Sequence, residues 1–218
     1  MKTITALILW TVFLPVTAKA QIPVEVFANP ENTSLDVMFF KFFQSKDKEE
    51  SQWLFFNRNR VVVDYQMTDT MNLPFFASVN AVSYNNKKLK GFAPVVVGQL
   101  LNRGVSAKAG IQFARVRSNF TVFTWFVSEV AKNPNLDYYV LVRYKPRLNK
   151  KWNGFLQGES LNVFPTQSAN LQLYQRARVG LDRASWQFGI GVDSNQIGRA
   201  EDFNTSIHAG VFLRHEFK

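Results

Sequence analysis

The chain has 218 residues, carries a formal net charge of +10 and contains no cysteine. This length allows one large domain or two small ones, and the absence of cysteine excludes a fold held together by disulfides. The basic residues do not form a long cluster, because their densest run, NNKKLKG at residues 85–91, has the composition of a turn. Together with the export signal described next, this argues against a nucleic-acid partner.

Residues 1–20 have the layout of a secretory signal peptide. A lysine stands near the start, residues 4–16 are almost wholly apolar, and Ala18 and Ala20 form a small-x-small cleavage site. The apolar run contains Pro15 and is shorter than the roughly 20 residues that a spanning helix needs. We therefore predict export, cleavage after Ala20 and a single domain over residues 21–218.

From residue 22 onward, apolar and polar residues alternate with a period of two, which is typical of β-strands with one apolar face. The first predicted strand, residues 22–28, is weak because Pro23 lies in it. The clearest later strands read, in chain order, RVVVDYQ, FFASVNAVS, FTVFTWFVS, LDYYVLVRYK, NLQLYQRARVGL and SWQFGIGVD. Eleven turn signals separate such segments and predict twelve strands, with ten as the alternative.

Two stretches break the alternation. In KWNGFLQGESLNVF, residues 151–164, apolar residues fall on both parities, which predicts a β-bulge. Residues 95–97 are all valine. Pro94, which precedes them, has no backbone N–H to donate to a neighbouring strand. After residue 20 no stretch has 18 consecutive apolar residues, so no transmembrane helix is predicted.

Several features favour lipid, rather than a second sheet, as the cover for the apolar face. Strands of about 9–13 residues suit a tilted membrane crossing, and only a closed barrel satisfies the backbone of strands in lipid. Amphipathic aromatic rings are expected at headgroup depth. We expect such interfacial aromatics at Trp53, Trp125, Tyr138, Tyr144, Trp152 and Trp186. The predicted fold class is all-β, a closed antiparallel up-and-down transmembrane β-barrel of about 12 strands with short turns.

The chain resembles small bacterial outer-membrane β-barrel proteins of the porin-like kind, most clearly in LYQRARVGLDRASWQFGIGVDSNQ and IHAGVFLRHEF. In such proteins the last strand alternates apolar residues and ends on an aromatic residue that the assembly machinery reads. Three positions match this signal: Val211, Leu213 and Phe217. Two depart from it: His215 and Lys218. The resemblance implies the outer membrane of a Gram-negative cell, with membrane lipid, lipopolysaccharide and the assembly machinery as partners.

If the apolar face meets lipid, the charged residues of the same strands point into the lumen. The predicted lumen-lining residues are Arg58, Arg60, Asp64, Lys108, Arg143, Lys145, Arg176, Arg178, Asp193, Arg214 and Glu216, with Asp137 as a further inward acid. Bases outnumber acids in this set, and unpaired charges cannot remain dry. This predicts either a wet, basic lumen that admits small anionic solutes, or a structural network of charges that holds the barrel shut.

The sequence offers little for catalysis. His208 and His215 have opposite parity and cannot share a metal ion, so we expect no metal and no cofactor. Ser206 and His208 share a face, but no acid is fixed by spacing to orient the histidine, and we expect no enzyme. Three functions remain open: a narrow passive pore, a non-conducting structural component, and a secreted lipocalin-like barrel that would turn its apolar face inward around a ligand.

Overall fold

The computed structural model describes residues 22–44, 50–66, 74–102, 104–131, 134–167, 170–199 and 202–217. The predicted signal peptide with its cleavage site after Ala20 lies outside these residues, and so does Lys218. The strands are β1 Ile22–Ala28, β2 Asn32–Gln44, β3 Glu50–Asp64, β4 Phe75–Tyr84, β5 Phe92–Leu101, β6 Gly104–Val116, β7 Phe120–Glu129, β8 Asn135–Tyr144, β9 Asn153–Pro165, β10 Leu171–Arg183, β11 Trp186–Arg199 and β12 Asp202–Phe217. A short 3-10 helix, η1 Lys87–Leu89, lies between β4 and β5.

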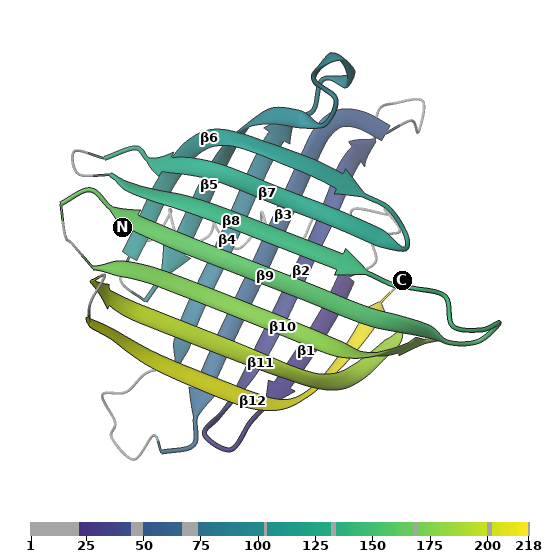
Figure 1. Ribbon diagram of the computed structural model, residues 1–218. Helices are drawn as coiled ribbons and strands as arrows, with labels where there is room; N and C mark the ends of the chain where they lie inside the picture. Colours follow the sequence, from purple (N-terminus) through teal and green to yellow (C-terminus); the bar gives the residue numbers. More distant parts are fainter. Residues whose placement is uncertain are drawn as a thin grey trace, which may run out of the picture.

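The twelve strands form one closed antiparallel barrel in which each strand pairs with its neighbours in sequence (Figure 1). The barrel closes where β1 pairs with β12, from Ile22 opposite Phe217 to Ala28 opposite Val211. The predicted fold class and strand number are therefore confirmed. We call the end that holds the start of β1 and the end of β12 the terminal rim, and the other end the far rim. No helix in the described part of the chain is long and apolar enough to cross a membrane.

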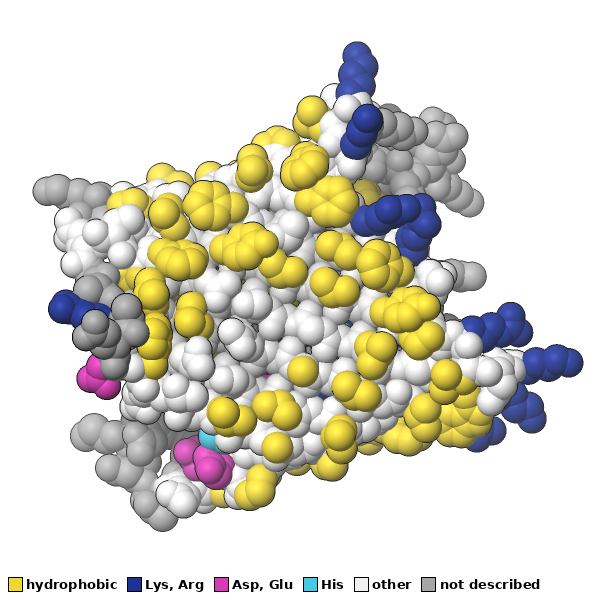
Figure 2. Space-filling model, in the orientation of Figure 1, with side chains coloured by type: hydrophobic (Ala, Val, Ile, Leu, Met, Phe, Trp, Pro, Cys, Tyr) yellow, Lys and Arg dark blue, Asp and Glu magenta, His cyan; other side chains and the backbone are white. Residues whose placement is uncertain are grey.

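Apolar side chains cover the outside of the barrel. On β11 and β12 the exposed residues include Ile190, Ile207, Val211 and Leu213, while the residues between them point into the barrel. Figure 2 shows apolar side chains spread over the visible face, with Lys and Arg gathered at one end. This arrangement does not favour the soluble lipocalin-like alternative, whose apolar face would line the interior.

The interior has two halves of different chemistry. Side chains from β2 to β8 form an apolar cluster, which comprises Met38, Phe56, Val79, Ala81, Val95, Val97, Phe123, Trp125, Val127, Tyr139 and Leu141. The rings of Phe56, Phe123 and Trp125 lie 5.1 to 5.4 Å apart between centroids. The other half, lined mainly by β9 to β12 and β1, holds charged side chains, with Phe27, Phe155 and Phe212 packed beneath them.

The predicted orientation of two strands is wrong. Trp125, predicted at the membrane interface, is only 6% exposed and lies inside the barrel, because β7 turns its Phe123–Trp125–Val127 face inward. Residues of the opposite parity, such as Phe126, are apolar enough to face lipid. On β4, likewise, Val79 and Ala81 point inward, while Asn80 points outward and accepts a 2.7 Å hydrogen bond from Asn57.

The bulge predicted in residues 151–164 is also wrong. β9 pairs with β10 in unbroken register, from Gln172 opposite Val163 to Asp182 opposite Asn153. The mixed parity arises because the interior itself accepts an apolar side chain, Phe155, while Leu156 faces outward. The register shift that the structure does contain lies between β2 and β3, around residues 42–44.

The inward direction of Trp125 can be tested by comparing Trp125→Ala with Phe126→Ala. The first change should lower the free energy of unfolding by about 3–5 kcal/mol, because it leaves a cavity among packed rings. The second removes a ring that is 47% exposed on the outer face and should cost much less. Urea unfolding in detergent micelles measures both. A larger loss for Phe126→Ala would mean that the faces of β7 are assigned the wrong way round.

Candidate functional site

The charged half of the lumen is built by alternation on neighbouring strands. Arg176 and Arg178 are two residues apart on β10, so both point inward, and Arg176 stands between Glu159 of β9 and Asp193 of β11. Gly191 lies opposite Arg178, and a Cβ at Gly191 would come within 2.6 Å of Cδ of that arginine. The glycine therefore leaves the space in which the arginine side chain lies.

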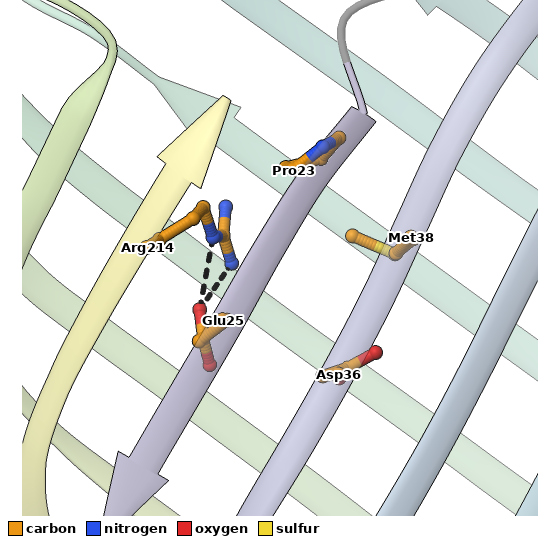
Figure 3. Close-up of a pocket in the computed structure, with 5 residues that line it drawn as sticks. All are labelled: Pro23, Glu25, Asp36, Met38 and Arg214. Carbon is orange, nitrogen blue, oxygen red and sulfur yellow. Dashed lines mark hydrogen bonds and ion pairs between the residues drawn. The ribbon is translucent and has the colours of Figure 1, made fainter. Parts of the chain in front are cut away.

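Glu25 on β1 is the acceptor on which several arginines converge. Its carboxylate accepts a 3.0 Å hydrogen bond from Nε of Arg178. It also accepts two hydrogen bonds from Nε and Nη2 of Arg214, which Figure 3 shows. Nη2 of Arg176 lies 3.4 Å from the same carboxylate. Glu25 is only 2% exposed, so these charges neutralise each other away from bulk water.

Other ion pairs cross the lumen between strands that are not neighbours. Arg58 of β3 joins Asp36 and Glu159, each through a 2.6 Å contact, and so links β2 and β3 to β9. Arg176 of β10 also reaches Asp36 at 2.6 Å. Arg60 of β3 reaches Asp193 of β11 at 2.8 Å.

These crossing contacts hold opposite walls of the barrel together. We call the set the lumen lattice: Glu25, Asp36, Arg58, Arg60, Glu159, Arg176, Arg178, Asp193 and Arg214. Tyr139 connects it to the apolar half, because its hydroxyl lies 3.2 Å from Oε2 of Glu159 while its ring packs in the apolar cluster.

The remaining predicted lumen residues lie toward the two rims. At the terminal rim, Lys145 pairs with Asp182 at 3.0 Å and with Glu216 at 2.6 Å. Toward the far rim, Lys108 pairs with Asp137 at 2.5 Å. The Arg143 side chain donates a 2.7 Å hydrogen bond to Gln157. Asp64 is exposed at the far end of β3, where it accepts a hydrogen bond from the backbone of Gln66.

The interior contains more acidic residues than the alternation pattern predicted. The additional carboxylates are those of Glu25, Asp36, Glu129, Glu159 and Asp182. Glu25 and Asp36 do alternate with apolar neighbours in IPVEVFA and SLDVMFF, and this signal could have revealed them. With these five acids added to Asp64, Asp137, Asp193 and Glu216, nine acids stand against the eight predicted bases, and the excess of positive charge inferred from the sequence disappears. The lumen lattice itself holds five arginines and four carboxylates.

One small cavity adjoins the lumen lattice near Glu25. This cavity, lined by Pro23, Glu25, Asp36, Met38 and Arg214, has a volume of about 10 Å³, which is roughly the room that one water molecule needs (Figure 3). Oppositely charged side chains therefore contact each other across the barrel, and the cavity beside Glu25 is too small for a solute larger than water.

The predicted interfacial aromatics divide into three groups. Trp53, Tyr144, Trp152 and Trp186 stand at the terminal rim, Tyr138 faces outward near the far rim, and Trp125 is inside, as described above. On β12, the residues Val211, Leu213 and Phe217 face outward next to the seam with β1. Recognition of these three residues by an assembly machinery stays a prediction.

His208 has an acidic partner that the sequence did not indicate. Its Nδ1 lies 3.0 Å from Oε2 of Glu31, which belongs to the turn between β1 and β2 and is exposed. Ser206 shares the inward face of β12 with His208, but no hydrogen bond between Ser206 and His208 is formed in the described structure.

Comparison with solved structures places the fold among porins. The NanC porin matches with a TM-score of 0.53 and 8% sequence identity, over 91% of this chain and 100% of that chain. The KdgM porin in complex with disordered oligogalacturonate matches with a TM-score of 0.49 and 10% identity, over 91% of this chain and 99% of that chain. This chain has the fold of a porin-like β-barrel. No protein-family model and no curated protein matches its sequence.

The convergence on Glu25 predicts a large effect of Glu25→Gln. Removal of the charge leaves Arg214 without its carboxylate in a buried site and leaves Arg178 with Asp193 alone, so the free energy of unfolding should fall by about 3–5 kcal/mol. Glu31→Gln is the matched control, because Glu31 is 64% exposed and its pair should contribute at most about 1 kcal/mol. Equal losses in the two variants, measured by urea unfolding in micelles, would contradict a central role for Glu25.

Proposed function

We propose that this chain is an integral outer-membrane β-barrel that does not conduct in the state described, and that it serves as a structural component or subunit partner in the membrane. The observation that carries the proposal is the set of ion pairs that cross the lumen, above all Arg58 with Glu159 and Arg176 with Asp36. These contacts and the apolar cluster of the other half lie inside the barrel, where a solute would have to pass, and this supports the proposal.

The energetics favour a closed barrel. A solute that entered would have to separate Arg58, Arg60 or Arg176 from a buried carboxylate, and removing one partner from such a pair costs about 3–5 kcal/mol. The lumen lattice contains several such ion pairs. Thermal fluctuation would therefore rarely clear a continuous path.

A passive pore for small anions is the second candidate. The fold shared with the NanC porin favours it, and an anionic solute could exchange with Glu25 or Asp36 for the guanidinium groups of the lattice. In this version the barrel would be an anion-selective pore. It would open only when an anion replaces a carboxylate of the lumen lattice as the partner of an arginine. We propose no catalytic activity and no cofactor for either version.

We also propose how the chain reaches the outer membrane. We infer export by the signal peptide with cleavage after Ala20, followed by insertion among outer-membrane lipid and lipopolysaccharide. The alternating apolar residues of β12 would serve as the signal for the assembly machinery.

Planar-bilayer recording tests the closed state. The purified wild-type chain should give no stepwise conductance under conditions in which the NanC porin, as a positive control, gives open channels. Steady anion-selective steps from the wild type would favour the pore over the structural component. Cation-selective steps would contradict both versions, since the buried acids are already held by arginines.

The role of the last strand can be tested by deleting Phe217 and Lys218. The deletion removes the terminal aromatic residue and the pairing of Ile22 with Phe217 at the seam, so membrane insertion should fall strongly. Heat-modifiable electrophoretic mobility of the membrane fraction measures folded barrel. Deletion of Lys218 alone is the control and should leave insertion close to that of the wild type. Normal insertion of the shorter variant would show that Phe217 is not part of an assembly signal.

A further inference from the structure

We propose that the terminal rim binds the phosphate headgroups of anionic phospholipids. The inference rests on the proposed membrane location. It adds the class of lipid that is bound and the end of the barrel that binds it.

Three turns on the terminal rim repeat one pattern, an exposed aliphatic side chain beside one or two basic residues. The segments are Lys88-Leu89-Lys90, Arg115-Val116-Arg117 and Arg147-Leu148. Their aliphatic side chains are 49%, 41% and 57% exposed. An aliphatic side chain between bases suits the boundary between acyl chains and headgroups, because the apolar part enters the bilayer while the charged groups stay among the phosphates. A soluble polyanion would make no use of the aliphatic residues.

Eight exposed bases of this rim form no ion pair with an acid of the described residues. We define the basic collar as Lys88, Lys90, Arg115, Arg117, Arg147, Lys150, Lys151 and Arg183. All are exposed, and none forms an ion pair with a carboxylate in the described part of the chain. Two acids near this rim, Asp182 and Glu216, turn inward onto Lys145. Figure 2 shows the resulting concentration of Lys and Arg at one end of the barrel.

A band of outward aromatic rings fixes the depth of the collar. The rings next to the terminal rim include Phe43, Trp53, Tyr84, Phe92, Tyr144, Trp152, Trp186 and Phe217. Trp and Tyr rings in such a band lie at headgroup depth. The guanidinium of Arg183 lies 4.9 Å from the ring centroid of Trp152, so collar and band are in direct contact. The collar therefore lies at the level of lipid phosphates.

The far rim is different. Its exposed charged residues in the described structure include the acids Glu31, Asp64 and Asp202 as well as the base Arg199. Among the described residues, the exposed charge that attracts anionic lipid is therefore concentrated at the terminal rim. Each Lys or Arg at an anionic surface strengthens association about fivefold at moderate salt, so removal of two collar charges gives a measurable change.

Quenching of tryptophan fluorescence by brominated lipids tests the proposal. Trp53, Trp152 and Trp186 stand at the terminal rim and report on the lipid there. In vesicles that contain phosphatidylcholine and phosphatidylglycerol in equal parts, brominated phosphatidylglycerol should quench the folded protein more strongly than brominated phosphatidylcholine, and high salt should reduce the difference. Lys150→Gln combined with Lys151→Gln should lower the relative affinity for phosphatidylglycerol by about tenfold or more.

The matched control is Arg199→Gln combined with Thr205→Glu, which makes the same change in net charge near the far rim and should leave the preference unchanged. Equal quenching by the two lipids in the wild type, or an equal loss in both double variants, would overturn the basic collar and leave the membrane barrel intact. Absence of quenching by either lipid would mean that the protein is not inserted, and would overturn the proposed function as well. Displacement of brominated phosphatidylglycerol by lipopolysaccharide but not by unlabelled phosphatidylglycerol would assign the collar to lipopolysaccharide, against this proposal.

Discussion

The structure depends on one electrostatic constraint, which is that every charge taken out of water needs a partner of opposite sign. The carboxylate of Glu25 meets this constraint for arginines from two other strands, Arg178 of β10 and Arg214 of β12. Asp36 and Asp193 do the same for arginines that reach them from across the lumen. Loss of a single acid would leave charges unpaired on several strands, so the lattice behaves as one unit rather than as a sum of separate pairs.

The size of the barrel explains which side chains fill it. Eight strands enclose a space that ordinary side chains just fill, and twelve strands enclose a wider one. Here the extra width is taken up by long or large residues, such as the arginines of β3 and β10 on one side and Phe56, Phe123 and Trp125 on the other. The same residue types would be oversized in a narrower barrel, and shorter ones would leave the lumen open.

The sequence predicts the strands well because alternation with a period of two is a local property. It therefore gives the strand count and the inward direction of Arg176 and Arg178. It fails on β4 and β7, where both faces are apolar and parity alone does not say which one meets lipid. The lattice could not be predicted either, because its partners, such as Arg58 and Glu159, come from strands far apart in the chain. Their contact depends on barrel closure and on side-chain length, which no local pattern records.

The seam between β1 and β12 has a consequence for the order of folding. Glu25 and Arg214 are 189 residues apart in sequence and meet only when the first and last strands pair. Before that moment Arg214 of β12 lacks its carboxylate and Arg178 of β10 lacks one of its two, so both remain hydrated. The inner face of the sheet therefore stays hydrated until β1 pairs with β12. Closure of the barrel and loss of water from its lumen occur together.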